Sequence, residues 1–193
     1  AIELYERIKT NGLDEGTLDH ARALMNQGTA RANLGNLGVS SRENYEQAIE
    51  LYERARAEGV DIGTPDYARC LLNQGNVHVN LGEMGVSPRE NFEQAIELYE
   101  RARTEGFEEG SPDYANALMQ QGNAYLRLGE MGVSPRENFK QTIELCERAR
   151  NEGFEEGTPG YANALMNQGN AHHSLGDLGV SPKKNYEQAR EFC

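Results

Sequence analysis

The eight residues MGVSPREN occupy positions 84–91 and return without a change at 131–138, 47 positions later. Other phrases of the sequence recur at the same interval. The stretch ENYEQAIELYERARAEG begins at Glu43, and near copies of it begin at Glu90, Glu137 and Lys184. The stretch NQGTARANLGNLG begins at Asn26, and related stretches begin at Asn73, Gln120 and Asn167. A fixed period of this length indicates a repeat architecture, here about four copies of one unit.

The repeated SPREN stretch has the composition of a helix start. Ser134 is expected to cap the helix through its hydroxyl, Pro135 to take the first helical position, and Glu137 to complete a capping box. The side chains that follow recur at helical spacing and are expected to form one face of the helix. They are Phe139, Thr142, Ile143, Cys146 and Ala149. Gly153, followed by the apolar Phe154, predicts the end of this helix in a Schellman motif.

A second helix is predicted in every unit. TPGY at 158–161 places Thr158 as the cap and Pro159 at the first helical position, and Gly179 is expected to end the helix. No stretch alternates polar and apolar residues as a strand would. The prediction is an all-α chain in which each unit holds two helices of roughly 18–21 residues joined by short turns.

These units predict a single array over 1–193 that stacks as a solenoid, since each helix pair buries its apolar face only against its neighbours. We expect this array to be a segment of a longer one. Its predicted parts are a partial helix at 1–11 and repeats at 17–59, 64–106, 111–153 and 158–193.

Charge and hydropathy exclude several classes of partner. The chain of 193 residues has a formal net charge of −12, which argues against nucleic acid and against an anionic membrane surface. No apolar run approaches the roughly 20 residues of a membrane span, and no signal peptide is visible. The sequence therefore predicts no nucleic-acid and no membrane partner.

The three cysteines are odd in number and form no CxxC pair. Cys146 and Cys193 occupy one position of successive repeats, where stacked helices lie about 8–10 Å apart, too far for a disulfide. Cys70 is the third. Reduced, partly buried thiols are the expectation, and they favour a cytoplasmic location.

The pair of stretches QGNAYLRLGEMG and FKQTIELCERA, at 121–132 and 139–149, resembles the tetratricopeptide repeat. Gly122, Tyr125, Leu128 and Gly129 match the first helix of that family's motif. The second-helix positions of the motif are matched by Ala95, Tyr99 and Ala102 of the preceding unit. The resemblance implies a right-handed superhelix of antiparallel helix pairs. The usual unit has about 34 residues, and the excess here is expected in the turn between the two helices and in an extended start of the first helix.

The resemblance further implies a non-catalytic scaffold that binds an extended peptide or helix of a partner protein in a concave groove. The first helix of each unit lines that groove. The groove positions of the family, carried onto this sequence, are Arg22, Asn26, Asn33, Arg69, Asn73, Asn76, Asn80, Asn116, Gln120, Asn123, Arg127, Asn163, Asn167 and Asn170, with Thr29 and Ser174 completing the rows. Amides repeated once per unit can hydrogen-bond a peptide backbone, and the arginines can attract carboxylates.

A structural interpretation of the amide rows stands beside this one, because duplicated repeats carry their asparagines along for local capping or contacts between repeats. Metal binding and catalysis have little support. His172 and His173 are adjacent and point to different sides of a helix, while His78 and His172 fall at a packing position. No GxSxG, phosphate loop or recurring Cys–His pair occurs, so we expect no cofactor and no enzyme.

Two further functions fit the same repeats. Nearly interchangeable units without a polar cap at either end favour stacking head to tail, which extends into a filament when the contact does not close. Alternatively, the array is the sensor or regulatory part of a larger multidomain protein.

Overall fold

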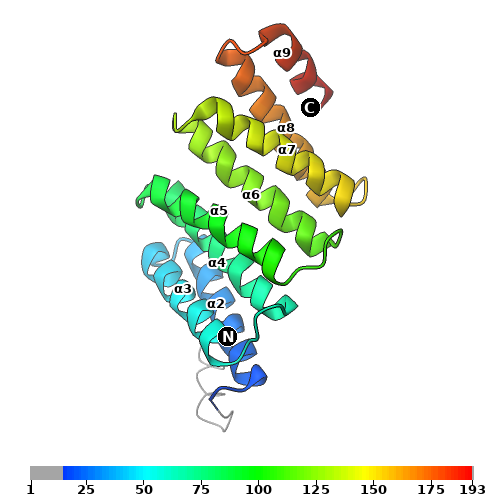
Figure 1. Ribbon diagram of the computed structural model, residues 1–193. Helices are drawn as coiled ribbons and strands as arrows, with labels where there is room; N and C mark the ends of the chain where they lie inside the picture. The colour runs from blue at the N-terminus through cyan, green and yellow to red at the C-terminus, as the bar shows by residue number, and fades with distance from the viewer. Residues whose placement is uncertain (1–14, 193) are drawn as a thin grey trace.

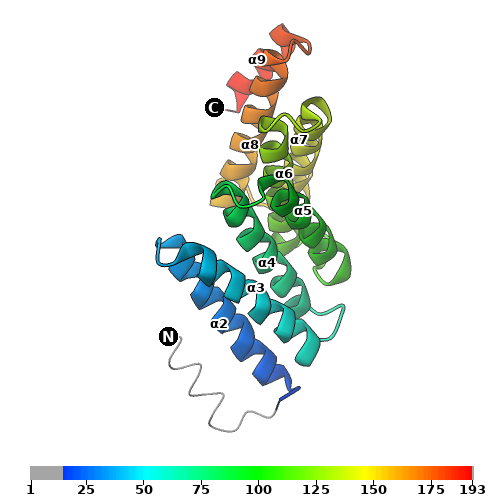
Figure 2. The ribbon, with the colours of Figure 1, turned by 90° about the vertical axis from the view of Figure 1, so that its left-hand side faces the viewer.

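The computed structural model describes residues 15–192, and the helices within this range confirm the all-α prediction. Four of them are the first helices of a unit: α2 (Leu18–Asn36), α4 (Pro65–Glu83), α6 (Pro112–Glu130) and α8 (Pro159–Asp177). Each is followed by its second helix: α3 (Ser41–Glu58), α5 (Pro88–Glu105), α7 (Pro135–Glu152) and α9 (Pro182–Glu191). Figures 1 and 2 show these pairs following one another in an elongated stack. The helix expected at 1–11 lies outside the described residues.

The first helices begin as their sequences predict. The Thr158 hydroxyl accepts a hydrogen bond from the backbone N–H of Tyr161 at 3.3 Å, and Thr158 has the extended backbone of a capping residue. Thr17, Thr64 and Ser111 cap α2, α4 and α6 in the same way. The start and end of α8 are confirmed, since Gly179 follows it with a φ of +73° that favours glycine.

The capping expected of Ser134 is wrong. Ser134 is left-handed, with φ 37° and ψ 54°, and its side chain makes no capping hydrogen bond. Capping by a hydroxyl requires an extended backbone, which directs the oxygen at the first-turn N–H groups. Instead the Asn138 amide donates to the carbonyl of Val133 at 2.6 Å and ties the turn to the helix. Ser40, Ser87 and Ser181 have the same conformation.

The extra residues do not lie in the turn between the two helices, where part of them was expected. The turn between α4 and α5 spans only the four residues 84–87. The helices themselves have 19 and 18 residues, which together exceed a whole unit of about 34 residues. The added length therefore lies in both helices of the unit.

Small residues let the helices of a pair cross closely. A Cβ atom on Gly75 would lie 2.6 Å from Cε1 of Tyr99, a side chain that is fully buried. Gly28 faces Tyr52 in the same way. In the third unit the residue opposite Gly122 is Cys146, whose sulfur lies 3.0 Å from such a Cβ. The crossing is therefore built on glycine in each of these units, although its partner changes.

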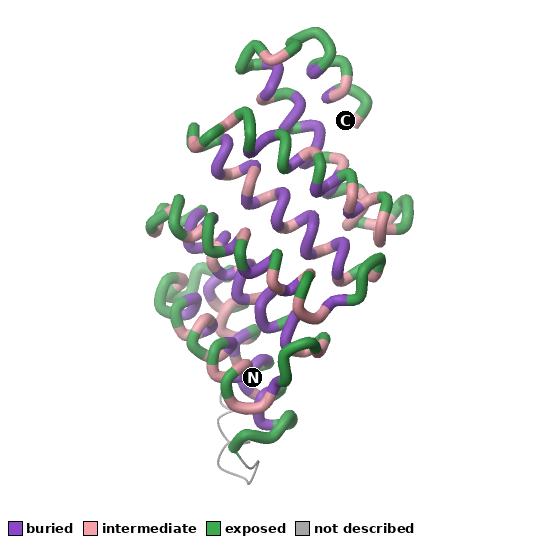
Figure 3. Tube along the Cα trace, in the orientation of Figure 1, coloured by how far each residue is buried: buried purple, intermediate pink, exposed green. Residues whose placement is uncertain are grey.

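One cluster of buried apolar side chains runs from Ala21 on α2 to Ala164 on α8, so the repeats share a continuous core. Figure 3 shows the buried residues along the inner sides of the helices and the exposed ones at the turns. Within residues 15–192, no helix combines the length and the apolar character needed to cross a membrane.

Candidate functional site

All the predicted groove residues lie on the first helices α2, α4, α6 and α8. Most are exposed or half-buried, and Asn167 is the exception, with 8% of its surface exposed. Positions separated by 47 residues fall at the same place on successive first helices. The rows of amides therefore cross the array from one unit to the next.

The structure brings six of the predicted residues together between α6 and α8, around an open cavity of about 270 Å³. These six are Gln120, Asn123, Arg127, Asn163, Asn167 and Asn170. Met119, Leu126 and Met166 complete the lining, and sequence reasoning did not single them out. The lining of this cavity thus combines amide groups with apolar side chains.

In the first two units, some side chains of the predicted groove rows already make hydrogen bonds within the chain. The Tyr99 hydroxyl donates to Oδ1 of Asn76 at 2.8 Å. Thr29 and the Tyr52 hydroxyl are 3.1 Å apart at the equivalent place, and the amide of Asn80 donates to Oδ1 of Asn36 at 3.0 Å. The structural interpretation of the asparagines therefore applies to these residues.

The third unit lacks the tyrosine that fills this role. Cys146 stands at the position of Tyr52 and Tyr99, and within residues 15–192 the side chain of Asn123 has no hydrogen-bond partner. Burial raises the pKa of the Cys146 thiol to about 12, against smaller opposing effects of the Arg150 charge and of a hydrogen bond with Asn167. The thiol is therefore protonated at neutral pH and acts as a small packing group.

The predicted arginines are paired with carboxylates of the chain itself. Nε of Arg22 lies 2.9 Å from Oδ2 of Asp66, and Nη2 of Arg69 lies 3.3 Å from Oδ2 of Asp113, each joining successive units. An acidic ligand would have to displace these carboxylates, which weakens the expected attraction. At the next junction the corresponding residues are Asn116 and Gly160, so this ionic link is missing there.

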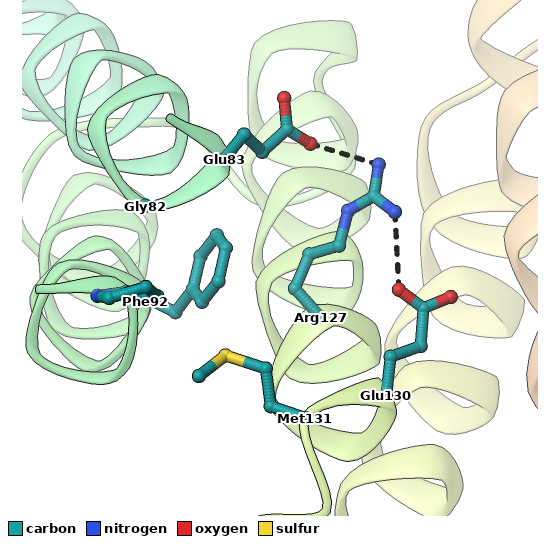
Figure 4. Close-up of a pocket in the computed structure, with 7 residues that line it drawn as sticks. Gly82, Glu83, Phe92, Arg127, Glu130 and Met131 are labelled. Atoms are coloured by element: carbon teal, nitrogen blue, oxygen red, sulfur yellow. Dashed lines mark hydrogen bonds and ion pairs between the residues drawn. The ribbon is translucent and has the colours of Figure 1, made fainter. Parts of the chain in front are cut away.

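A second cavity, of about 560 Å³, lies where the ends of α4 and α6 meet the start of α5. Figure 4 shows Arg127 between two carboxylates, at 2.9 Å from Glu83 and 3.2 Å from Glu130, with Phe92 and Met131 beside it. Arg127 lines both cavities.

The nature of the aromatic residue explains why Glu83 is available to Arg127. Where the second helix begins with Tyr45 or Tyr186, the hydroxyl donates to Asn36 or Asp177 at the end of the first helix. Phe92 has no hydroxyl, and the equivalent Glu83 pairs with Arg127 instead. The distribution of tyrosine and phenylalanine in the sequence is a signal that could have predicted this difference.

The histidines at the packing position make hydrogen bonds to asparagine. Nδ1 of His78 lies 2.7 Å from Oδ1 of Asn91, and Nδ1 of His172 lies 2.8 Å from Oδ1 of Asn185. Burial lowers the pKa of His78. In the described range 15–192, His, Cys, Asp and Glu side chains form no group of three or more that could hold a metal ion.

Comparison with protein families agrees with this architecture. A family model described as tetratricopeptide repeat matches residues 41–86 and 89–141, just over half of the chain. The chain belongs to the tetratricopeptide repeat family. A Sel1 repeat model also matches residues 162–193, over α8 and α9. The matched segments do not follow the 47-residue unit, whose boundaries they leave untested.

These two repeat families are in general non-catalytic scaffolds for protein interactions. A comparison with curated proteins finds no match for the chain. The tetratricopeptide repeat array of this protein is therefore supported by its family models and its fold, whereas the groove residues remain a prediction.

Proposed function

We propose that this tetratricopeptide repeat array is a non-catalytic scaffold that binds an extended segment of a partner protein along α2, α4, α6 and α8. The observation that carries the proposal is the cavity between α6 and α8, which is lined by amides from two successive first helices. The same amide positions recur on α2 and α4, so the surface continues along the array.

The chemistry of the lining favours a peptide backbone. An asparagine side chain offers two N–H donors and one carbonyl acceptor, which match the C=O and N–H groups of an extended chain. Such contacts do not depend on the sequence of the partner. The nearby Met119, Leu126 and Met166 supply apolar contacts for its side chains. The partner we propose is therefore an extended, largely uncharged protein segment.

The double exchange of Asn123 and Asn170 to alanine tests this function. The probe is a library of random dodecapeptides displayed on phage, selected on the intact chain, with the best peptides then synthesised and labelled. We expect the variant to lose peptide binding while its helicity and melting temperature stay close to those of the parent. Loss of fold in the variant would instead assign the amides a structural role, and failure to select any peptide would contradict the proposed function.

Head-to-tail assembly makes a different prediction, which separates it from the scaffold. Stacking through end faces requires the molar mass in solution to climb with concentration. For the scaffold proposed here, we expect light scattering to give a constant molar mass over a hundredfold range of concentration. A regulatory array within a larger protein would use the same peptide-binding surface.

The buried free thiols of Cys70 and Cys146 fit a reducing compartment such as the cytoplasm.

A further inference from the structure

We infer that the segment of the groove between α6 and α8 is the anchoring subsite, where amides hold the backbone of the partner, and that the α2–α4 segment contributes less. This inference rests on the proposed function and locates its strongest contacts. It follows from differences between repeats that are otherwise nearly identical.

The first difference is whether the side chains in the row of Thr29, Asn76, Asn123 and Asn170 already make hydrogen bonds within the chain. On α4, Asn76 accepts a hydrogen bond from Tyr99, and on α2 the equivalent Thr29 is occupied by Tyr52. The next members of the row are Asn123 and Asn170, whose side chains have no hydrogen-bond partner within residues 15–192. A partner's backbone can pair with these two amides without breaking a contact that already exists.

The second difference lies behind the row, at the helix crossing. The small side chain of Cys146 replaces a tyrosine, and it has no hydroxyl that reaches Asn123. Thr142 stands where the second unit has Ala95, and its hydroxyl lies 3.0 Å from the carbonyls of both Gly122 and Asn138. The hydroxyl of Thr142 is therefore committed to the backbone and leaves the amide of Asn123 free.

The third difference is the charge at the junction of the third and fourth units. The ion pairs Arg22–Asp66 and Arg69–Asp113 cross the two earlier junctions, whereas Asn116 and Gly160 stand at the same positions here. The charged side chain of the cavity, Arg127, already contacts two carboxylates. The subsite is thus lined mainly by neutral polar groups, which suits the peptide backbone better than a charged side chain.

The side walls of the subsite add a preference for apolar residues in the partner. Met166 is 54% exposed beside the amides, while Met119 is nearly buried below them. Methionine is flexible and adapts to different apolar shapes. Asn167 lies in the same wall, with 8% of its surface exposed. The occupant we infer is an extended segment with an apolar side chain directed at these methionines.

The test compares variants of the intact chain for affinity to a labelled dodecapeptide selected from the random library. Asn123→Ala removes the free amide, and the double exchange Thr142→Ala with Cys146→Tyr rebuilds the arrangement of the second unit and occupies that amide. We expect each to weaken peptide binding by about tenfold, the effect of losing one or two backbone hydrogen bonds. Asn26→Ala changes an amide of the α2 segment instead, and it should weaken peptide binding less than Asn123→Ala does.

The outcomes separate the two proposals. If peptides bind and Asn26→Ala weakens them as much as Asn123→Ala does, the anchoring subsite is refuted and the scaffold function stands. If no peptide is selected on the intact chain, both fail. Circular dichroism shows whether the double variant folds. If it does not fold, the comparison of Asn123→Ala with Asn26→Ala decides, because neither side chain has a hydrogen-bond partner to lose within residues 15–192.

Discussion

Replacing Gly75 with alanine probes the helix crossing that defines the repeat. The new Cβ would lie 2.6 Å from Cε1 of Tyr99 and 3.0 Å from two further ring atoms. Non-bonded carbon atoms prefer separations of about 3.5–4.0 Å, so the ring or the helix has to move. The Tyr99 ring is fully buried and its hydroxyl is bonded to Asn76, which leaves it little room.

Two opposing terms set the expected magnitude. Overpacking of this kind destabilises by about 1–3 kcal/mol. Alanine is favoured over glycine inside a helix by about 1 kcal/mol, which offsets part of that loss. We expect Gly75→Ala to lower the free energy of unfolding by about 1 kcal/mol, or the melting temperature by roughly 2–4 °C for a chain of this size.

The matched variant is Gly122→Ala in the next unit. Its Cβ would meet the Cys146 sulfur at 3.0 Å, and every other neighbour is at 3.4 Å or farther. A displacement of a few tenths of an ångström relieves this contact, so the gain in helix propensity dominates. We expect a melting temperature equal to or above that of the parent.

Thermal unfolding followed by circular dichroism compares the two variants under identical conditions. We expect Gly75→Ala to be the less stable of the pair. If it proved as stable as Gly122→Ala, or more so, the tyrosine ring would not be the limit on helix approach. Adding Tyr99→Phe to Gly75→Ala serves as a control. It removes the hydroxyl but not the ring, so it should not relieve the clash.

Three further predictions concern caps, thiols and acid stability. Ser134→Ala should change the free energy of unfolding by less than about 0.5 kcal/mol, whereas Thr158→Ala should lower it by about 0.5–2 kcal/mol; equal effects in chemical unfolding would contradict the two capping assignments. Burial raises the pKa of Cys70 and of Cys146 to about 12, so in a Cys193→Ser variant both thiols should react slowly with Ellman's reagent until the chain is unfolded, and rapid reaction of the folded chain would show that they are accessible. A hydrogen bond from Arg101 lowers the pKa of Glu105 below its usual range, so its stabilising contribution is present at neutral pH and is lost as the pH falls through the lowered value; Arg101→Gln should move acid unfolding, followed by circular dichroism, to higher pH, and an unchanged midpoint would contradict this.

The fold could be predicted because its signals are local and repeated. Thr158, Pro159 and Gly179 mark the ends of a helix through short-range chemistry, and the repeat multiplies each signal. The conformation of Ser134 was missed, since a residue before proline is expected to have an extended backbone. The turn is closed by a hydrogen bond from the Asn138 side chain to the carbonyl of Val133, five residues earlier. The capping rules do not include this bond.

The sequence by itself determined the period, the helical class and the face on which the amides lie, because these depend on residue spacing along one helix. Only the tertiary structure decided which of those amides are occupied. Asn76 is engaged by Tyr99 from 23 positions away, and Arg69 by Asp113 from 44 positions away. Such contacts depend on how two helices are packed and on which rotamers the packing allows. The sequence shows that Cys146 stands where the two preceding units have tyrosine. That this leaves Asn123 without a hydroxyl partner follows only from the geometry of the helix crossing.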